Sequence, residues 1–215
     1  MSTRKARSFF TILSIFLGIA TIFVFSSFGI GLYNYVNNLT QKSSADKVII
    51  QPIGGTFSAF DSNVKFGDKD IRAIKKVPGV YEVSGAYFET IKVEAQDKTF
   101  FTLMISYEPK TPLMFESSNI GIEKGRHVID GKKEVVLGHS YLVKGRILDK
   151  PLDINQKIKI NGEKIKVVGF LEEVGNPQDD SQVYSSNKYF EKFFSEKNIS
   201  YKWIVAKVNP KEVDS

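Results

Sequence analysis

The chain has 215 residues, with 30 basic and 24 acidic side chains and a formal net charge of +6 at pH 7. It contains no cysteine, so disulfide frameworks, cysteine metal sites and thiol catalysis are excluded. Three of the basic residues, Arg4, Lys5 and Arg7, lie at the N-terminus, and the other 27 are mixed with the 24 acidic residues along the rest of the chain. Such a mixed surface indicates solubility and not a nucleic-acid partner.

A long apolar segment near the N-terminus dominates the prediction. Residues 9–32 include 24 positions without a charge, and a helix of that length is about 36 Å long. The hydrocarbon core of a bilayer is about 30 Å thick, so the segment predicts a transmembrane helix over 9–32. Basic residues precede it and the next charge after it is Lys42. The positive-inside rule therefore places residues 1–8 in the cytoplasm and the rest of the chain outside.

Two alternatives are open for this segment. A cleaved signal peptide also has a basic start, but its apolar part is usually about 7–15 residues long and precedes a small-x-small cleavage site. Here the only small cluster, Ser26-Ser27, is followed by the bulky Phe28, so the sequence favours an uncleaved anchor. A buried helix of a soluble protein fits the length and the cationic flank less well.

Residues 33–47 are predicted to form a membrane-proximal stalk. Tyr33 and Tyr35 suit the aromatic belt at the membrane interface, and the polar remainder should extend the helix by a turn or two before Ser43-Ser44. Inside the anchor, small residues recur four positions apart and would let another helix approach closely, although unselected small residues explain them about as well. The pairs are Ser14 with Gly18 and Ser27 with Gly31.

Residues 48–210 are predicted to form an extracytoplasmic α+β domain, with a possible subdomain division near residue 120. Periodicity and turn residues set its expected elements. In chain order these are a strand over 48–50, a loop over 56–65, a helix over 68–77, strands over 80–94 and 99–106, an irregular segment over 107–119, a strand over 134–137, a short helix over 139–148, a hairpin over 157–160 and 163–170, a polar loop over 172–182, a helix over 187–196 and a strand over 203–208.

Local signals support three of these elements most directly. Asp68 is the expected N-cap of the first helix, and Pro78-Gly79 follows its last apolar residue as a stop. Asn161-Gly162 lies between two alternating runs, and a type I′ hairpin turn needs positive φ at both of its central residues. Ser186 or Asn187 is the expected cap of the later helix. The lysines of the hairpin are interpreted as the solvated side of a half-buried sheet.

Candidate catalytic residues are few. His127 and His139 lie on different elements, and neither has a carboxylate or histidine partner one helical turn away, so a zinc site is not favoured. The adjacent acidic pairs Asp179-Asp180 and Glu172-Glu173 are interpreted as solvated loop charges. No GxSxG, HExxH, P-loop or GxGxxG pattern is present. We therefore predict no catalytic, cofactor-binding or metal-binding residues and no cofactor.

Two N-x-[ST] sequons begin at Asn38 and Asn198 and would face outward in this topology. Such short sequons also arise by chance, so they only make glycosylation possible.

The order of features resembles a known family. The basic N-terminus and an apolar helix containing Leu17-Gly18-Ile19-Ala20 come first. Four segments follow, namely FGDKDIRAIKKVPGVYEVSGA at 66–86, GIEKGRHV at 121–128, EVVLGHSYLVKG at 134–145 and INQKIKINGEKIKVVGFLEE at 154–173. This ordered set is similar to the first membrane helix and the extracytoplasmic core domain of the MacB-like, FtsX-like permeases of ABC transporters. The resemblance covers nearly the whole chain.

The resemblance implies a mechanical role. Permeases of this family have four membrane helices, with the core domain inserted between the first and the second, and they work as dimers with a cytoplasmic ATPase subunit. ATP-driven motion of the helices is relayed to the outer domains, which export or release a substrate. The resemblance therefore implies a cytoplasmic ABC ATPase as partner, a homodimer or paired permease, contact with membrane lipid and localisation in the cell membrane. Family core domains have two subdomains, which a division near residue 120 matches only roughly.

One departure from the family pattern concerns the C-terminal end. No second hydrophobic run follows before Ser215, so we expect either the front part of a longer gene product or a split subunit. Two other classes are weighed. A single-pass membrane-anchored binding domain would act without an ATPase, and an exported hydrolase would need His127 or His139 beside a carboxylate cluster.

Overall fold

The structure is a computed structural model that describes residues 2–42, 46–52 and 65–209. The chain divides into two compact units, residues 1–43 and residues 44–215. The first unit is a single helix, and the second is a mixed helix and strand domain, called the core domain below. The predicted α+β class with one N-terminal apolar helix is confirmed.

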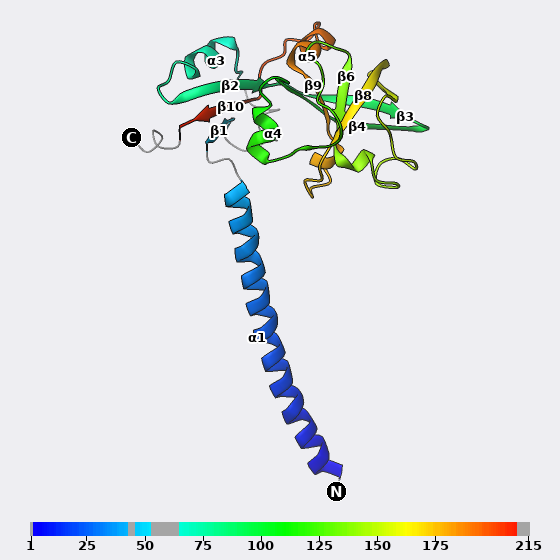
Figure 1. The fold of residues 1–215 in the computed structure, drawn as a ribbon. Coiled ribbons are helices and arrows are strands. Elements are labelled where there is room, and N and C mark those ends of the chain that lie inside the picture. Colours follow the sequence, from blue (N-terminus) through cyan, green and yellow to red (C-terminus); the bar gives the residue numbers. More distant parts are fainter. Residues whose placement is uncertain (1, 43–45, 53–64, 210–215) are drawn as a thin grey trace. The chain divides into compact units, whose positions relative to one another are not determined.

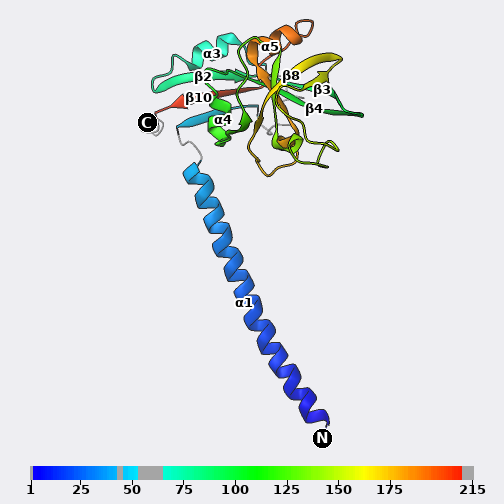
Figure 2. The ribbon, with the colours of Figure 1, turned by 45° about the vertical axis from the view of Figure 1, so that its right-hand side comes forward.

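Helix α1 spans Ser2–Lys42 and is continuous in both views (Figures 1 and 2). It begins before the predicted residue 9 and continues beyond residue 32, as the polar stalk suggested. Its stretch Phe9–Tyr35 is the one helix in the described part of the chain that is long and apolar enough to cross a membrane. The hydroxyls of Ser14 and Thr21 donate hydrogen bonds to carbonyls four residues earlier, at 2.9 and 2.7 Å. These polar groups are therefore satisfied inside the helix.

The core domain contains two sheets, of which the smaller is antiparallel with strand order β1-β10-β2. Its strands are β1 (Lys47–Ile50), β10 (Trp203–Val208) and β2 (Val80–Ala86). Helix α3 (Asp68–Ile74) contacts β2, and helix α4 (Leu113–Ser118) contacts β2 and β10. The pairing of β1 with β10 places the first and last described strands of the domain side by side. The Val208 amide donates to the Asp46 carbonyl at 2.6 Å at the end of this ladder.

The larger sheet closes on itself. Its strand order is β5-β8-β6-β9-β4-β3-β7, and β7 pairs with β8 as well as with β3. Six strands therefore form a closed barrel, while β5 pairs with the last residues of β8. The strands are β3 (Phe88–Ala95), β4 (Lys98–Tyr107), β5 (Ile122–Gly125), β6 (Glu134–Leu137), β7 (Lys157–Ile160), β8 (Glu163–Leu171) and β9 (Val183–Ser186). Helix α5 (Asn187–Phe193) follows β9.

Alternating side chains build a separate core on each face of the barrel wall. Along β6, Val135 and Leu137 join one buried cluster with the other inward residues, whereas Val136 joins the second. That second cluster lies on the outer face and also holds Phe115 of α4, with Trp203 of β10 packed against it. Because both faces are covered, β6 is apolar at successive positions rather than at alternate ones.

Several predicted elements are confirmed. The strands over 48–50, 134–137 and 203–208 occur as expected. The hairpin is also present, and its turn residues Asn161 and Gly162 have φ of 47° and 87°. Ser186 caps α5 by accepting a hydrogen bond from the Tyr189 amide.

The single strand predicted over 80–94 is wrong. Tyr87 separates β2 from β3, and these strands belong to different sheets. The Tyr87 ring stacks on Tyr201 and Phe190, at centroid distances of 4.3 and 5.5 Å. Its amide donates to the Ser106 hydroxyl at 2.8 Å. Tertiary packing, and not a local turn signal, therefore moves the chain from one sheet to the other.

The segment over 107–119 is not irregular throughout, because Leu113–Ser118 forms helix α4. Pro112 stands at its N-cap, and the burial of Leu113 and Phe115 stabilises this short helix against the outer core.

The helix predicted over 139–148 is reduced to a 3₁₀ turn at His139–Tyr141. Tyr141 is fully buried and its hydroxyl donates to the Ser181 carbonyl at 3.0 Å, so a tertiary contact fixes this segment. Strand β9 was not predicted. All its residues are buried, and it therefore lacks the alternation of a half-buried strand.

Helix α3 is shorter than the prediction over 68–77, and its N-cap is Gly67 rather than Asp68. The Gly67 amide donates to the Asp70 carboxylate at 2.8 Å. A side chain within the helix thus accepts the N-cap amide, instead of the N-cap side chain accepting an amide of the helix. Most of the loop predicted over 56–65 lies outside the described residues. The predicted division near residue 120 coincides with neither change of sheet, since the chain changes sheets at Tyr87 and again between α5 and β10.

Candidate functional site

His127 is half-buried and lies beside Tyr107 and Phe115 of the cluster on the outer face of the barrel. Its Nδ1 is 3.1 Å from the Tyr107 hydroxyl, and its ring centroid is 5.8 Å from that of Phe115. The Tyr107 oxygen also accepts the Val128 amide at 3.2 Å, so the phenol connects the imidazole to the backbone. Burial lowers the pKa of His127, which favours the neutral ring. The partner of His127 is thus a phenol, and the contact is a structural one.

His139 lies beside a cleft of about 500 Å³ that Ser140, Arg146 and Glu173 help to line. Its Nδ1 is 2.6 Å from Glu123 Oε2. Arg146 donates to Glu173 at 2.5 Å, and this bond lowers the pKa of the Glu173 carboxyl. Among the described residues, no group of three or more His, Cys, Asp and Glu side chains could hold a metal ion. His139 therefore has one carboxylate partner and not the cluster that a hydrolase would need.

The acidic pairs have structural partners. Asp180 is only 2% exposed and accepts the amides of Val174 and Gly175 at 2.8 and 3.1 Å. Its interpretation as a solvated loop charge is therefore wrong, because this carboxylate holds the preceding loop. Asp179 accepts from Asn176 and Gln182, each at 2.9 Å.

Glu172, like Glu173, has a specific partner. Its Oε2 accepts the Gly121 amide at 2.9 Å, which joins the segment before β5 to the end of β8. Of the two sequons, the one at Asn38 begins within α1, and Asn198 is exposed after α5.

One apolar groove of about 330 Å³ lies on the smaller sheet beside α3. Val48 of β1 and Val77 after α3 line it and are 39% and 52% exposed. Its other lining residues are Ile50, Ile74, Pro78, Gly79, Val80, Ala206, Val208 and Asn209.

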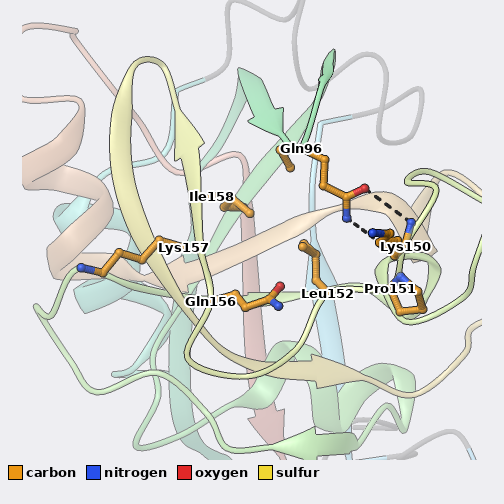
Figure 3. A pocket seen from close by; sticks show the side chains of 8 residues that line it. Gln96, Lys150, Pro151, Leu152, Gln156, Lys157 and Ile158 are labelled. Carbon is orange, nitrogen blue, oxygen red and sulfur yellow. Dashed lines mark hydrogen bonds between the residues drawn. The ribbon is translucent and has the colours of Figure 1, made fainter.

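A different cleft of about 370 Å³ opens where β3 and β7 separate. These strands pair at only two positions, Val93↔Ile160 and Glu94↔Lys159. Beyond them, Gln96 turns toward residue 150: its Nε2 donates to the Lys150 carbonyl at 2.8 Å, and its Oε1 accepts the Lys150 amide at 3.4 Å. Figure 3 shows Ile158 between Gln96 and Lys157, and Leu152 between Gln96 and Gln156, in this cleft.

These clefts offer surfaces for binding. The titratable side chains that line them are the ion-paired Arg146 and Glu173, Asp180 with its backbone amide donors, and the lysines Lys150 and Lys157. Sequence reasoning did not locate the cleft between β3 and β7, because Gln96 and Lys150 are 54 positions apart. The alternating lysines of the hairpin were the one local signal that could have drawn attention to it.

Comparisons with known proteins agree with this architecture. Residues 8–214 match the family described as the MacB-like periplasmic core domain. An uncharacterized ABC transporter permease of Methanocaldococcus jannaschii is 30% identical over 193 residues, which are 89% of this chain and 47% of that protein. The present chain therefore spans about half the length of this curated relative.

Two solved structures share the fold. The periplasmic region of MacB from Actinobacillus actinomycetemcomitans has a TM-score of 0.62 at 15% identity, with 83% of this chain and 80% of that chain covered. The extracellular domain of the transporter YknZ from Gram-positive bacteria has a TM-score of 0.56 at 16% identity, with 78% and 85% covered.

Proposed function

Because the chain belongs to the MacB-like periplasmic core domain family, we propose that it is the N-terminal part, or a separate subunit, of an ABC transporter permease. In this proposal α1 remains in the membrane with residues 1–8 in the cytoplasm, and the core domain lies outside. Movement of the membrane helices, driven by a separate cytoplasmic ATPase, is relayed to the core domain for export or release of a substrate. The permease works as a homodimer or with a second permease.

The family match over residues 8–214 is the observation that carries this proposal, since it includes the whole apolar stretch Phe9–Tyr35 as well as the core domain. The construction of the barrel is consistent with a part that transmits motion, because a closed ring of hydrogen-bonded strands resists deformation.

The decisive experiment is co-purification of the complete gene product from membranes. We expect an ABC ATPase to be recovered with it, and ATP hydrolysis by that complex to require the permease. Recovery of the protein from the membrane without any nucleotide-binding subunit, under conditions that preserve a known ABC complex, would contradict the proposal.

The topology has its own test. The chain has no cysteine, so single substitutions provide unique labelling sites. A membrane-impermeant maleimide applied to intact cells should label Ser195→Cys, which lies at an exposed position after α5, and should label Ser2→Cys only after lysis. Loss of residues 1–30 from the mature chain would instead show that the apolar helix is a cleaved signal peptide.

A further inference from the structure

The outer face of the β7–β8 hairpin carries an unusual arrangement of charge. Its inward side chains, Ile158, Ile160, Ile165 and Val167, are at most 2% exposed. The alternate positions therefore point outward, and the register sets Lys157 opposite Lys166 and Lys159 opposite Lys164. Like charges directly opposite each other destabilise a sheet. We call these four residues the lysine array.

The lysine array has few counterions. Lys159 lies 3.6 Å from Glu94, but Glu94 also pairs with Lys92 at 2.8 Å. Within the described ranges 2–42, 46–52 and 65–209, the ion pairs do not include the other three lysines of the array. The tight turn and the buried face of the hairpin therefore fix an excess of positive charge on its outer face.

This charge lies at the edge of the cleft between β3 and β7. A second cleft of about 330 Å³, lined by Glu94 and the three lysines Lys157, Lys159 and Lys164, shares Ala95, Gln96 and Lys157 with the cleft of Figure 3. The two clefts therefore adjoin but differ in chemistry. The outer one is lined by three lysines and Glu94, whereas the lining of the inner one includes the apolar residues Pro151, Leu152 and Ile158.

We propose that this double cleft binds a small anionic amphiphile. Its phosphate or carboxylate group lies among Lys157, Lys159 and Lys164, and its apolar chain lies along the exposed Pro151, next to the largely buried Leu152 and Ile158. The anion relieves the repulsion between the opposed lysines, while the chain fills a space of the size that small ligands occupy. All residues of this site belong to the core domain, so its binding can be tested without an ATPase.

The first test is titration of the full chain, held in nanodiscs of zwitterionic phosphatidylcholine, with hexyl phosphate. With isoleucine methyl groups labelled for NMR, we expect a saturable shift of Ile158 and little change of Ile204 in the smaller sheet. Inorganic phosphate tests for a bare-ion site and should bind at least tenfold more weakly. Hexyltrimethylammonium carries the same chain with the opposite charge and should not shift Ile158 at all.

The second test changes the charge with a matched control. Lys157→Glu/Lys164→Glu reverses one lysine in each opposed pair, so the folded hairpin gains attractive pairs and should keep its unfolding midpoint. We expect affinity for hexyl phosphate to fall about tenfold or more. Lys75→Glu/Lys76→Glu changes the net charge equally on exposed residues after α3 and should change the affinity less than twofold.

Four outcomes would overturn the proposal. They are no saturable shift at Ile158, equal binding of the cationic amphiphile, equal loss of affinity in the two double variants, and inorganic phosphate binding as tightly as hexyl phosphate. A poly-glutamate peptide that shifts Ile158 when hexyl phosphate does not would likewise replace the amphiphile with an acidic protein segment.

Discussion

The barrel and the smaller sheet show two ways of using β-strands in one core domain. Barrel strand β6 is covered on both faces, and Val135, Val136 and Leu137 are fully buried. In contrast, β1 and β2 are edge strands of the smaller sheet among the described residues, and helix α3 beside it has no buried residue. The comparison indicates that the barrel is the stable part of the domain and that the smaller sheet depends on it.

Removing a side chain from the barrel interior should give the largest effect. Phe170 is fully buried in the inner core, and Phe170→Ala should lower the free energy of unfolding by about 3–5 kcal/mol. Chemical denaturation followed by Trp203 fluorescence measures this change. Phe101→Ala is the matched control, because Phe101 is 72% exposed on β4. Similar losses in the two variants would mean that the barrel interior is not the main core.

A smaller effect is expected where the two sheets meet. A Cβ on Gly85 would lie 2.4 Å from Cδ1 of Tyr201, so Gly85→Ala must displace that ring, at a cost of about 1–3 kcal/mol. Hydrogen exchange should increase in β2 and β10 more than in the barrel. The double variant Gly85→Ala/Tyr201→Ala should cost less than the sum of the two single changes, because the clash is then absent. Strict additivity would contradict this explanation.

The ion pair between Arg126 and Glu134 should give the next largest effect on the free energy of unfolding, and that effect should depend on pH. Each terminal nitrogen of Arg126 donates a hydrogen bond to one carboxylate oxygen of Glu134 at 2.9 Å, and this pairing lowers the pKa of Glu134 from its usual 4.5. A carboxyl whose pKa is lower in the folded state stabilises the fold above its unfolded-state pKa, and that contribution disappears as the pH falls through the folded-state value. Glu134→Gln should therefore cost about 1–2 kcal/mol at pH 7, with partial solvent exposure of Arg126 reducing the effect.

The difference between wild type and Glu134→Gln should shrink in denaturation curves as the pH falls from 7 through the folded-state pKa of Glu134, which lies below 4.5. Glu163→Gln serves as the control, since Glu163 and its partner Lys133 are 55% and 46% exposed at their side chains. A difference between wild type and Glu134→Gln that grows as the pH falls would show that another group controls the transition.

The smallest effect should come from the groove on the smaller sheet. Val77 is 52% exposed there, and Val77→Ser should change the free energy of unfolding by no more than about 0.5 kcal/mol. A loss of several kcal/mol, measured by the same denaturation assay, would mean that this face is covered in the folded protein. The contrast between the two sheets would then fail.

Local signals were sufficient for elements whose cause is local. Asn161-Gly162 has the positive φ angles of the predicted turn, and Ser186 caps α5 as its side chain suggests. Elements that depend on distant packing were missed. Tyr87 ends a strand because Tyr201 and Phe190 stack on it, and β9 is buried on both faces, so its sequence shows no alternation.

The candidate site likewise has one feature that the sequence predicts and one that it does not. The two-residue turn at Asn161-Gly162 fixes the hairpin register, so the opposition of Lys157 to Lys166 follows from the sequence alone. The cleft beside these lysines does not follow from the sequence alone. It exists because β7 completes a ring by pairing briefly with β3, and because Gln96 binds the backbone of Lys150.

The antiparallel pairing of β1 with β10 determines how the core domain would respond to tension. The chain enters the domain at Asp46 and leaves β10 at Val208, and these residues are hydrogen-bonded neighbours at one end of the ladder. A pull that separates them would break the rungs one after another, as in unzipping, rather than loading all of them together in shear. Under tension, the pairing of β1 with β10 would therefore separate at low force, before the barrel deforms.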